Sequence, residues 1–107
     1  MGDLVKRDPF ALIKRLVLKR QAIFTDKAER ELAANDLTRD EVYESIWGAP
    51  GIQQTLNSKN PETGDPETLY VIHGLTLDGI PVYTKGKVVE KGKELYFYVL
   101  ISSKRLK

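Results

Sequence analysis

The chain has 107 residues, a formal net charge of +2 and 41% hydrophobic residues, a composition typical of one soluble globular domain spanning residues 1–107. It has no cysteine and one histidine, which excludes disulfides and thiolate-metal sites and argues against a zinc or copper site. The sequence contains no phosphate-binding loop, dinucleotide fingerprint or metal-ligand cluster, so we expect no metal and no cofactor. No apolar run reaches the length of a membrane span or signal peptide, which predicts a cytoplasmic protein without membrane contact.

Three helices are predicted in the N-terminal half. After a polar lead, Met1–Arg7, Asp8 caps the first helix and Pro9 occupies its first position. The apolar face of this helix carries Phe10, Ile13, Leu16 and Val17. The opposite face carries Lys14, Arg15 and Lys19, and it is either solvated, in contact with RNA phosphates, or the docking surface of an acidic partner.

The second and third helices are separated by a short polar turn. Gln21–Phe24 is expected to be an apolar link, after which Thr25 or Asp26 caps a helix that ends at Ala34 and is closed by Asn35 in a left-handed conformation. Thr38 and Glu41 match a capping box, which predicts a third helix reaching about Trp47. Gly, Ala, Pro and Gly then end it.

Four strands are predicted in the C-terminal half: Ile52–Asn57, Leu69–Leu75, Ile80–Val89 and Glu94–Ser103. An irregular polar loop follows the first of them, Asp78-Gly79 predicts a two-residue type I′ hairpin turn, and Lys91-Gly92 marks another turn. The order of elements predicts an α+β fold, with about three N-terminal helices packed on one face of a four-stranded antiparallel sheet.

Period-2 alternation assigns the strand side chains to two faces. On the third strand, Ile80, Val82, Thr84 and Val88 share one face, which we expect to point toward the helices, and Tyr83, Lys85 and Lys87 share the other. On the fourth strand, Phe97 is expected to point toward the helices with Leu95, Val99 and Ile101. That leaves Tyr96, Tyr98 and Lys104 on the solvent face. A sheet face that combines tyrosines and lysines suits RNA, because bases stack on rings and phosphates pair with cations.

Positive charge is concentrated near the C-terminus. Residues 81–107 hold seven Lys and Arg against Glu90 and Glu94, a surplus of five. This surplus favours an anionic partner, although lysines that keep a sheet edge soluble would explain it as well. His73 shares a face with Leu69, Val71 and Leu75, which favours a half-buried, hydrogen-bonded histidine over a catalytic one.

The order and spacing of several motifs resemble a known family. They are the Ala28–Ser45 segment with Leu-Thr-Arg-Asp-Glu-Val-Tyr-Glu-Ser, then Val-Ile-His-Gly-Leu-Thr-Leu-Asp-Gly-Ile-Pro-Val-Tyr-Thr-Lys-Gly-Lys, and Ile-Ser-Ser-Lys-Arg at the end. From about Phe10 onward the chain resembles a bacterial family of small proteins related to motility quorum-sensing regulator toxins and, more remotely, to RelE-type mRNA interferases. The resemblance implies a RelE/ParE-like toxin fold.

The resemblance also implies roles for particular residues. The family motif Val-Tyr-x-Lys matches Val82 to Lys85, which places a family catalytic tyrosine on Tyr83, and a family lysine near the C-terminal strand end matches Lys104. A family lysine on the first strand falls near Gln53 or Gln54, and this chain has no lysine there. A family glutamine that falls near Leu69 or Tyr70 is absent as well.

The function implied is that of a type II toxin, a metal-independent endoribonuclease that cleaves mRNA by 2′-OH attack, on or off the ribosome. Its partner would be a cognate antitoxin of the helix-turn-helix class. The candidate catalytic residues are Tyr83, Lys85, Lys104 and His73, and the candidate RNA-binding residues are Lys87, Lys59, Tyr96, Tyr98 and Arg105. A non-catalytic RNA-binding module and an antitoxin-binding protein of the same fold remain as alternatives.

Overall fold

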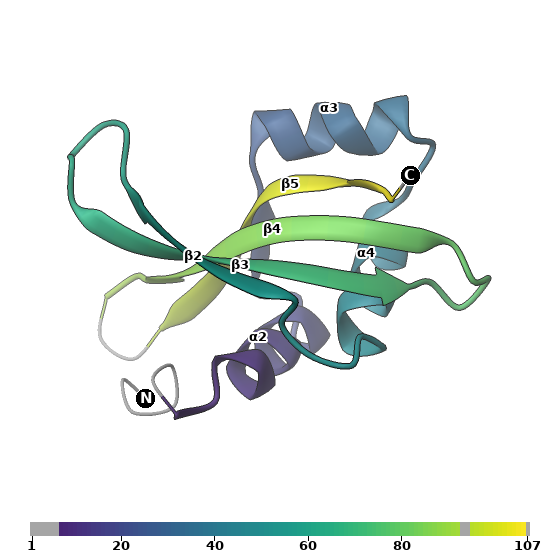
Figure 1. Ribbon diagram of the computed structural model, residues 1–107, viewed down its shortest axis with the longest axis horizontal. Helices are drawn as coiled ribbons and strands as arrows, with labels where there is room; N and C mark the ends of the chain where they lie inside the picture. The colour runs from purple at the N-terminus through teal and green to yellow at the C-terminus, as the bar shows by residue number, and fades with distance from the viewer. Residues whose placement is uncertain (1–6, 93–94, 107) are drawn as a thin grey trace.

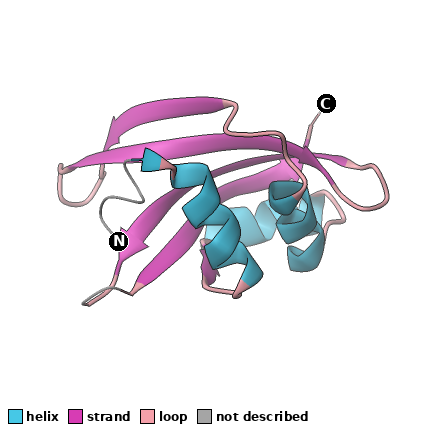
Figure 2. Ribbon diagram, turned by 90° about the horizontal axis from the view of Figure 1, so that it is seen from below, coloured by secondary structure: helices cyan, strands magenta, loops and turns pink. Residues whose placement is uncertain are grey.

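The computed structural model describes residues 7–92 and 95–106 of the chain. This part forms an α+β domain of two layers, with the strands in one layer and the helices packed on one side of it (Figures 1 and 2). Residues 1–6 of the predicted polar lead, and Glu94 at the predicted start of the last strand, lie outside the described residues.

The helices are α2 (Pro9–Leu18), α3 (Asp26–Ala34) and α4 (Arg39–Trp47). Their N-terminal caps are those predicted. The Asp8 carboxylate accepts a hydrogen bond from the Ala11 N–H at 3.0 Å, and Thr38 and Glu41 form both bonds of the capping box. After α3, however, Asn35 keeps a negative φ and the following Asp36 takes the left-handed conformation with φ 55°.

The strands are β1 (Ala22–Phe24), β2 (Gln54–Lys59), β3 (Pro66–Leu75), β4 (Pro81–Glu90) and β5 (Tyr96–Arg105). They form a mixed sheet in the order β1-β5-β4-β3-β2, with β1 parallel to β5 and the other pairs antiparallel. The expected four-stranded antiparallel sheet is therefore wrong.

The error lies in the segment expected to be an apolar link. The Tyr98 N–H donates to the Gln21 carbonyl and the Thr25 N–H donates to the Leu100 carbonyl, each at 3.0 Å. Three residues carry too little alternation to indicate a strand, and their hydrogen-bond partners come from the other end of the chain. Pairing with β5 alone makes Ala22–Phe24 a strand.

The turn between β3 and β4 is longer than the expected two-residue hairpin. The strands end at Leu75 and resume at Pro81, and Thr76 organises the residues between them. Its carbonyl accepts from the Gly79 N–H at 2.9 Å and its hydroxyl accepts from the Ile80 N–H at 3.0 Å. Gly79 has φ 82°, so it supplies the positive φ of this longer turn.

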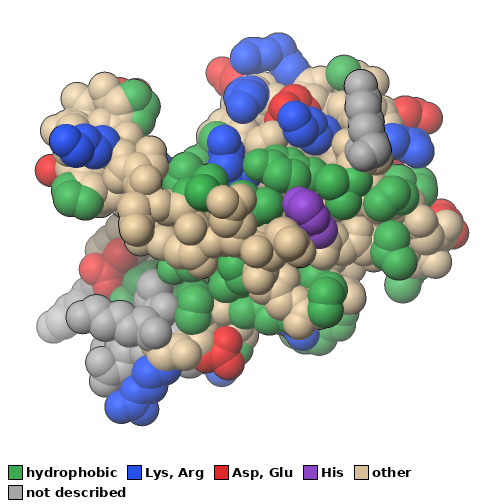
Figure 3. All heavy atoms as spheres, viewed as in Figure 1, with side chains coloured by type: hydrophobic (Ala, Val, Ile, Leu, Met, Phe, Trp, Pro, Cys, Tyr) green, Lys and Arg blue, Asp and Glu red, His purple; other side chains and the backbone are tan. Residues whose placement is uncertain are grey.

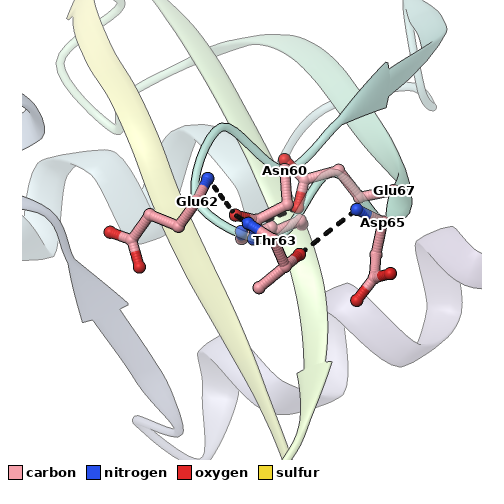
Figure 4. Close-up of polar contacts among 6 residues, drawn as sticks. Asn60, Glu62, Thr63, Asp65 and Glu67 are labelled. Carbon is pink, nitrogen blue, oxygen red and sulfur yellow. Dashed lines mark hydrogen bonds and ion pairs between the residues drawn. The ribbon is translucent and has the colours of Figure 1, made fainter.

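The loop between β2 and β3 is ordered by one asparagine. The Asn60 side-chain oxygen accepts from the N–H groups of Glu62 and Thr63 at 2.8 and 3.2 Å, and the Thr63 hydroxyl accepts from the Asp65 N–H (Figure 4). An asparagine that bonds to N–H groups two and three residues ahead stabilises a tight turn. The loop is thus hydrogen-bonded within itself at the far end of the hairpin.

The predicted division of side chains between the two sheet faces holds on β4 but fails on β5. Val82 and Thr84 on β4 are buried and point toward the helices, as predicted. On β5 the fully buried hydrophobic residues are Tyr98 and Leu100, whereas Phe97 is only half-buried and lies outside the core. Between Tyr96 and Ile101 both sets of β5 side chains are apolar or aromatic, so alternation alone could not identify the buried set.

Two features of the sheet explain this arrangement. Gly86 leaves space for the Tyr98 ring, since a Cβ on Gly86 would lie 2.6 Å from Tyr98 Cζ. The second feature is a β-bulge. Lys85 pairs with Ser102 while Gly86 pairs with Leu100, so Ile101 is an extra residue on β5. Because of this bulge, Tyr98 points into the core while Lys104, an even number of residues away, still points outward.

Candidate functional site

The outer face, meaning the sheet face away from the helices, carries a row of three side chains from three strands. His73 on β3 pairs with Tyr83 on β4, which pairs with Lys104 on β5. The ring centroids of His73 and Tyr83 are 5.5 Å apart, and Lys104 Nζ lies 5.4 Å from the Tyr83 ring centroid. The structure therefore brings together three of the four residues predicted as catalytic.

Figure 3 shows that the histidine is accessible near the middle of this face, with hydrophobic and uncharged groups beside it and basic side chains toward α3. Its neighbours Leu69 and Val71 lie on the same face of β3 but outside the helix-packed core. His73 is half-buried, and its strand pairs regularly with β4 through Gly74. The ring of His73 thus lies against Tyr83 and not against the helices.

Lys85 completes the set on the outer face. It follows Tyr83 by two residues on β4, and its backbone pairs with Val71 and Ser102. Within residues 7–92 and 95–106 no ion pair or side-chain hydrogen bond engages its ammonium group. A half-buried lysine without an internal counter-ion is available to neutralise a bound anion.

An open hollow lies on each side of the Tyr83 ring. The first, of about 510 Å³, is lined by Asn35, Tyr83, Lys104, Arg105 and Leu106. The second, of about 670 Å³, is lined by Gln53, Gln54, Val71, His73, Tyr83 and Leu106. Tyr83 and Leu106 line both hollows. A bound polymer that crosses the sheet here would therefore touch Tyr83 from either side.

Lys87, predicted to bind RNA, is already paired. Its Nζ lies 2.9 Å from Glu67 Oε2, and the two side chains are 21% and 17% exposed. A largely buried pair of this kind is costly to separate, because each ion would be left without its partner. Lys87 is therefore a structural cation joining β4 to β3.

The two predicted base-stacking tyrosines are on the opposite side of the sheet. Tyr98 is 0% exposed and Tyr96 is 8% exposed, and both belong to the core against the helices. Burial raises the pKa of the Tyr98 phenol above its ordinary value, with a smaller contribution from Tyr70. The prediction that Tyr96 and Tyr98 lie on the solvent face is wrong, because their side chains face the helices, so they cannot serve as stacking rings on the outer face.

Arg105 and Lys59 have different surroundings. Arg105 donates from Nε to the Asn35 carbonyl at 2.7 Å, which fixes its guanidinium against the end of α3 at the border of the first hollow. Lys59 pairs with Pro66 at the other end of the β2–β3 hairpin. Pro66 lies seven residues before His73 on β3, about 23 Å along the strand. Lys59 is exposed but remote from the row.

The residues around Tyr83 supply the groups needed for proton transfer at a phosphate. A neutral imidazole can accept a proton, a phenol can donate one or hold it in a hydrogen bond, and two ammonium groups can balance negative charge. His73, Tyr83, Lys85 and Lys104 present all of them on one exposed surface. The arrangement suits an extended phosphodiester that crosses the strands.

Sequence reasoning did not identify Asn35 and Leu106 as part of this site. Asn35 belongs to the end of α3, and its side-chain oxygen accepts from the Arg105 N–H at 3.1 Å. Leu106 lies past the end of β5 and is held by the bond from its N–H to the Pro81 carbonyl at 2.9 Å. Both reach the site through tertiary contacts, so no local pattern could have indicated them. Gln53 and Gln54, by contrast, line the second hollow, and the family resemblance places a lysine near one or the other of them.

The described residues contain no group of three or more His, Cys, Asp or Glu side chains that could hold a metal ion. In the described part of the chain, no helix is long and apolar enough to cross a membrane. The chain matches no protein-family model, no curated protein and no solved structure. The interpretation of the site therefore depends on its own geometry.

Proposed function

We propose that the outer face binds single-stranded RNA and that the row His73, Tyr83 and Lys104 cleaves it by attack of a 2′-OH on the adjacent phosphate. The observation that carries this proposal is the alignment of an imidazole, a phenol and an ammonium group across three strands, beside the uncommitted Lys85. Bases can pack against the exposed parts of these rings while the phosphates meet the lysines.

Each residue has a distinct role in this reaction. His73 takes the proton from the 2′-OH, and the 2′-oxygen then attacks phosphorus. The bond to the 5′-oxygen breaks, and Tyr83 supplies or holds the proton that this oxygen acquires. Lys104 and Lys85 stabilise the additional negative charge on the phosphoryl oxygens. The products are a 2′,3′-cyclic phosphate and a 5′-hydroxyl, and the steps require no metal ion.

The family resemblance supports a biological setting for such an activity. An mRNA endonuclease of this kind would act in the cytoplasm as the toxin of a type II system and would be neutralised by a co-expressed helix-turn-helix antitoxin. The departures at Gln53, Gln54, Leu69 and Tyr70 mean that this chain would use His73 in place of the missing family residues.

The test is an RNA cleavage assay with the purified protein, alone and with ribosomes, in the presence and absence of a chelator. We expect wild-type protein to leave cyclic phosphate ends with and without chelator. Tyr83→Phe and His73→Gln should each lower the rate by about 10²–10³-fold, as expected for loss of one proton-transfer or hydrogen-bonding group. Tyr43→Phe on α4 is the matched control, since it removes a phenol hydroxyl far from the outer face.

The outcomes separate cleavage from binding. If wild-type protein leaves RNA intact under all conditions but binds it through Lys85, the protein is a non-catalytic RNA-binding module. If it neither cuts nor binds RNA at low salt, both RNA functions are wrong, and an antitoxin-binding protein becomes the better proposal.

A further inference from the structure

An exposed apolar band crosses the helix side of the molecule, away from the outer face. Its members are Leu18 at 64% exposure, Trp47 at 49% and Leu77 at 87%, and Leu75, at 58%, lies at the border with the outer face. They line a hollow of about 380 Å³ formed by the ends of α2 and α4 and the β3–β4 turn. Leu18 and Trp47 also line a second hollow, of about 450 Å³, with Phe10 and Lys14. We call the two adjoining hollows the apolar groove.

The walls of the apolar groove are held in place by specific contacts. Glu44 on α4 accepts a hydrogen bond from the Leu77 N–H at 3.0 Å, which fixes the β3–β4 turn against the helix. Gly74 allows β3 to approach α4, since a Cβ there would lie 1.8 Å from the Ser45 carbonyl oxygen. The exposed leucines are therefore carried on fixed elements, and a contiguous apolar patch of this kind on a soluble domain typically marks a contact surface.

Around the apolar groove the acidic side chains already have partners within the chain, whereas some of the basic side chains do not. Its acidic residues are all engaged within the chain: Asp8 caps α2, Glu44 binds the Leu77 N–H, and Asp40 pairs with Arg20 at 3.3 Å. On the α2 side, Lys14 and Arg15 have no ion pair within the described residues, and Lys14 Nζ lies 4.9 Å from the Trp47 ring centroid.

Arg20 does not add to this positive side, because it is the counter-ion of Asp40. The two side chains of that pair are 60% and 72% exposed, so the pair itself is weak. Among the described residues, the free cations beside the apolar floor are therefore Lys14 and Arg15 on α2.

We propose that the apolar groove is a docking site for an acidic amphipathic helix of another protein. Apolar side chains of that helix, spaced at i, i+3 or i+4 and i+7, would pack on Leu18, Trp47 and Leu77, in the manner of helix-in-groove recognition. Its carboxylates would face Lys14 and Arg15. This site lies on the helix layer, so it is independent of the proposed RNA chemistry on the outer face.

The experiment is a selection of random 16-residue peptides displayed on phage against the full chain, with Leu18→Ser/Leu77→Ser protein as the counter-selection. The enriched peptide is then synthesised with a fluorophore, and its Kd is measured by anisotropy. We expect enriched sequences to carry helical apolar spacing flanked by Asp or Glu. Leu77→Ser should weaken binding by about 10-fold or more, which is the loss expected when a buried leucine contact is removed.

Two further variants test the charge and the location. The Lys14→Glu/Arg15→Glu variant should bind the acidic peptide more weakly. A peptide with lysines in place of the carboxylates should restore the affinity for this variant. Leu95→Ser is the matched control, because Leu95 is 43% exposed at the other end of the sheet and should leave Kd unchanged. All of these residues are at the surface, so circular dichroism should confirm that the variants stay folded.

Three results would overturn the proposal. Selection that enriches nothing, or enriches basic peptides, would rule out an acidic helix as the occupant. Binding unchanged by Leu18→Ser/Leu77→Ser would place the peptide elsewhere. Wild-type protein that sediments as a dimer, and becomes monomeric in that double variant, would show that a second copy of this chain fills the apolar groove.

Discussion

Tyr98 carries a hydroxyl that is buried without a hydrogen-bond partner among the described residues. The side chain is 0% exposed, and its ring fills the space that Gly86 leaves open on the neighbouring strand. A buried polar group without a partner costs free energy, because it loses its bonds to water and gains none in return. The ring, and not the hydroxyl, therefore accounts for the place of Tyr98 in the core.

We predict that Tyr98→Phe raises the free energy of unfolding by about 1 kcal/mol, because it removes the unpaired hydroxyl and keeps the ring. Urea denaturation of the two proteins would measure the difference. A loss of stability of similar size would show that the hydroxyl has a partner in solution and would contradict this account.

The same residue predicts sensitivity to alkali. Burial raises the pKa of Tyr98 above the ordinary 10.0, so only the unfolded chain ionises this phenol just above pH 10. Stability is thus fully present below pH 10 and falls as the pH rises, by up to about 1.4 kcal/mol per pH unit for one such tyrosine.

Unfolding curves between pH 9 and 11 would test this, with Tyr98→Phe as the comparison. The variant should lose less stability over this range. A smaller dependence of stability on pH should remain because of Tyr43 and Tyr70, whose pKa values burial also raises. Equal slopes for both proteins would mean that Tyr98 ionises in the folded state as readily as in the unfolded state.

At the scale of elements, one glycine determines how closely α4 packs on the sheet. A Cβ on Gly74 would lie 1.8 Å from the Ser45 carbonyl oxygen and 2.7 Å from its carbonyl carbon. Both are backbone atoms, so relief requires a shift of the whole helix. The same contact places Leu75 and Leu77 beside Trp47.

We predict that Gly74→Ala lowers the free energy of unfolding by about 3 kcal/mol, at the upper end of the usual cost of overpacking. Gly51→Ala is the matched control, because no atom lies within 4 Å of its added Cβ and its φ is not positive. Thermal or urea unfolding would measure both. A Gly74→Ala protein as stable as the control would show that α4 shifts freely.

For the whole molecule, the distribution of free and paired lysines determines how it should meet a polyanion. Lys85 has no internal counter-ion among the described residues, whereas Lys87 is paired with Glu67. Each cation that neutralises a phosphate releases counterions and steepens the dependence of affinity on salt, by slightly less than one unit in log K against log[salt] for single strands.

We predict that Lys85→Ala reduces this slope for single-stranded RNA by about 0.7, and that Lys87→Ala changes it far less. Filter binding or anisotropy over a salt series would measure the slopes. Lys27→Ala is the control, because Lys27 is exposed on α3 in the helix layer. A flat salt dependence for the wild type, or equal effects of Lys85→Ala and Lys87→Ala, would contradict this assignment.

The sequence by itself determined the features that depend on neighbouring residues. Asp8, Thr38 and Glu41 set the helix starts because a cap bonds to N–H groups two or three positions away. Strict alternation on β4 identified Val82 as buried and Tyr83 as outward, because one residue advances a strand side chain to the other face. The helix layer and the outward direction of Tyr83 and Lys85 follow from these local rules.

Only the tertiary structure decided the features that join distant parts of the chain. Ala22–Phe24 is a strand because it pairs with β5, and Tyr98 faces the core because Gly86 leaves room for its ring. Lys87 is paired because β3 places Glu67 beside it. Tyr83 meets Lys104 because the bulge at Ile101 turns the Lys104 side chain to the outer face. These contacts depend on the register between strands, and a single sequence does not contain it when both faces of a strand are apolar enough to be buried.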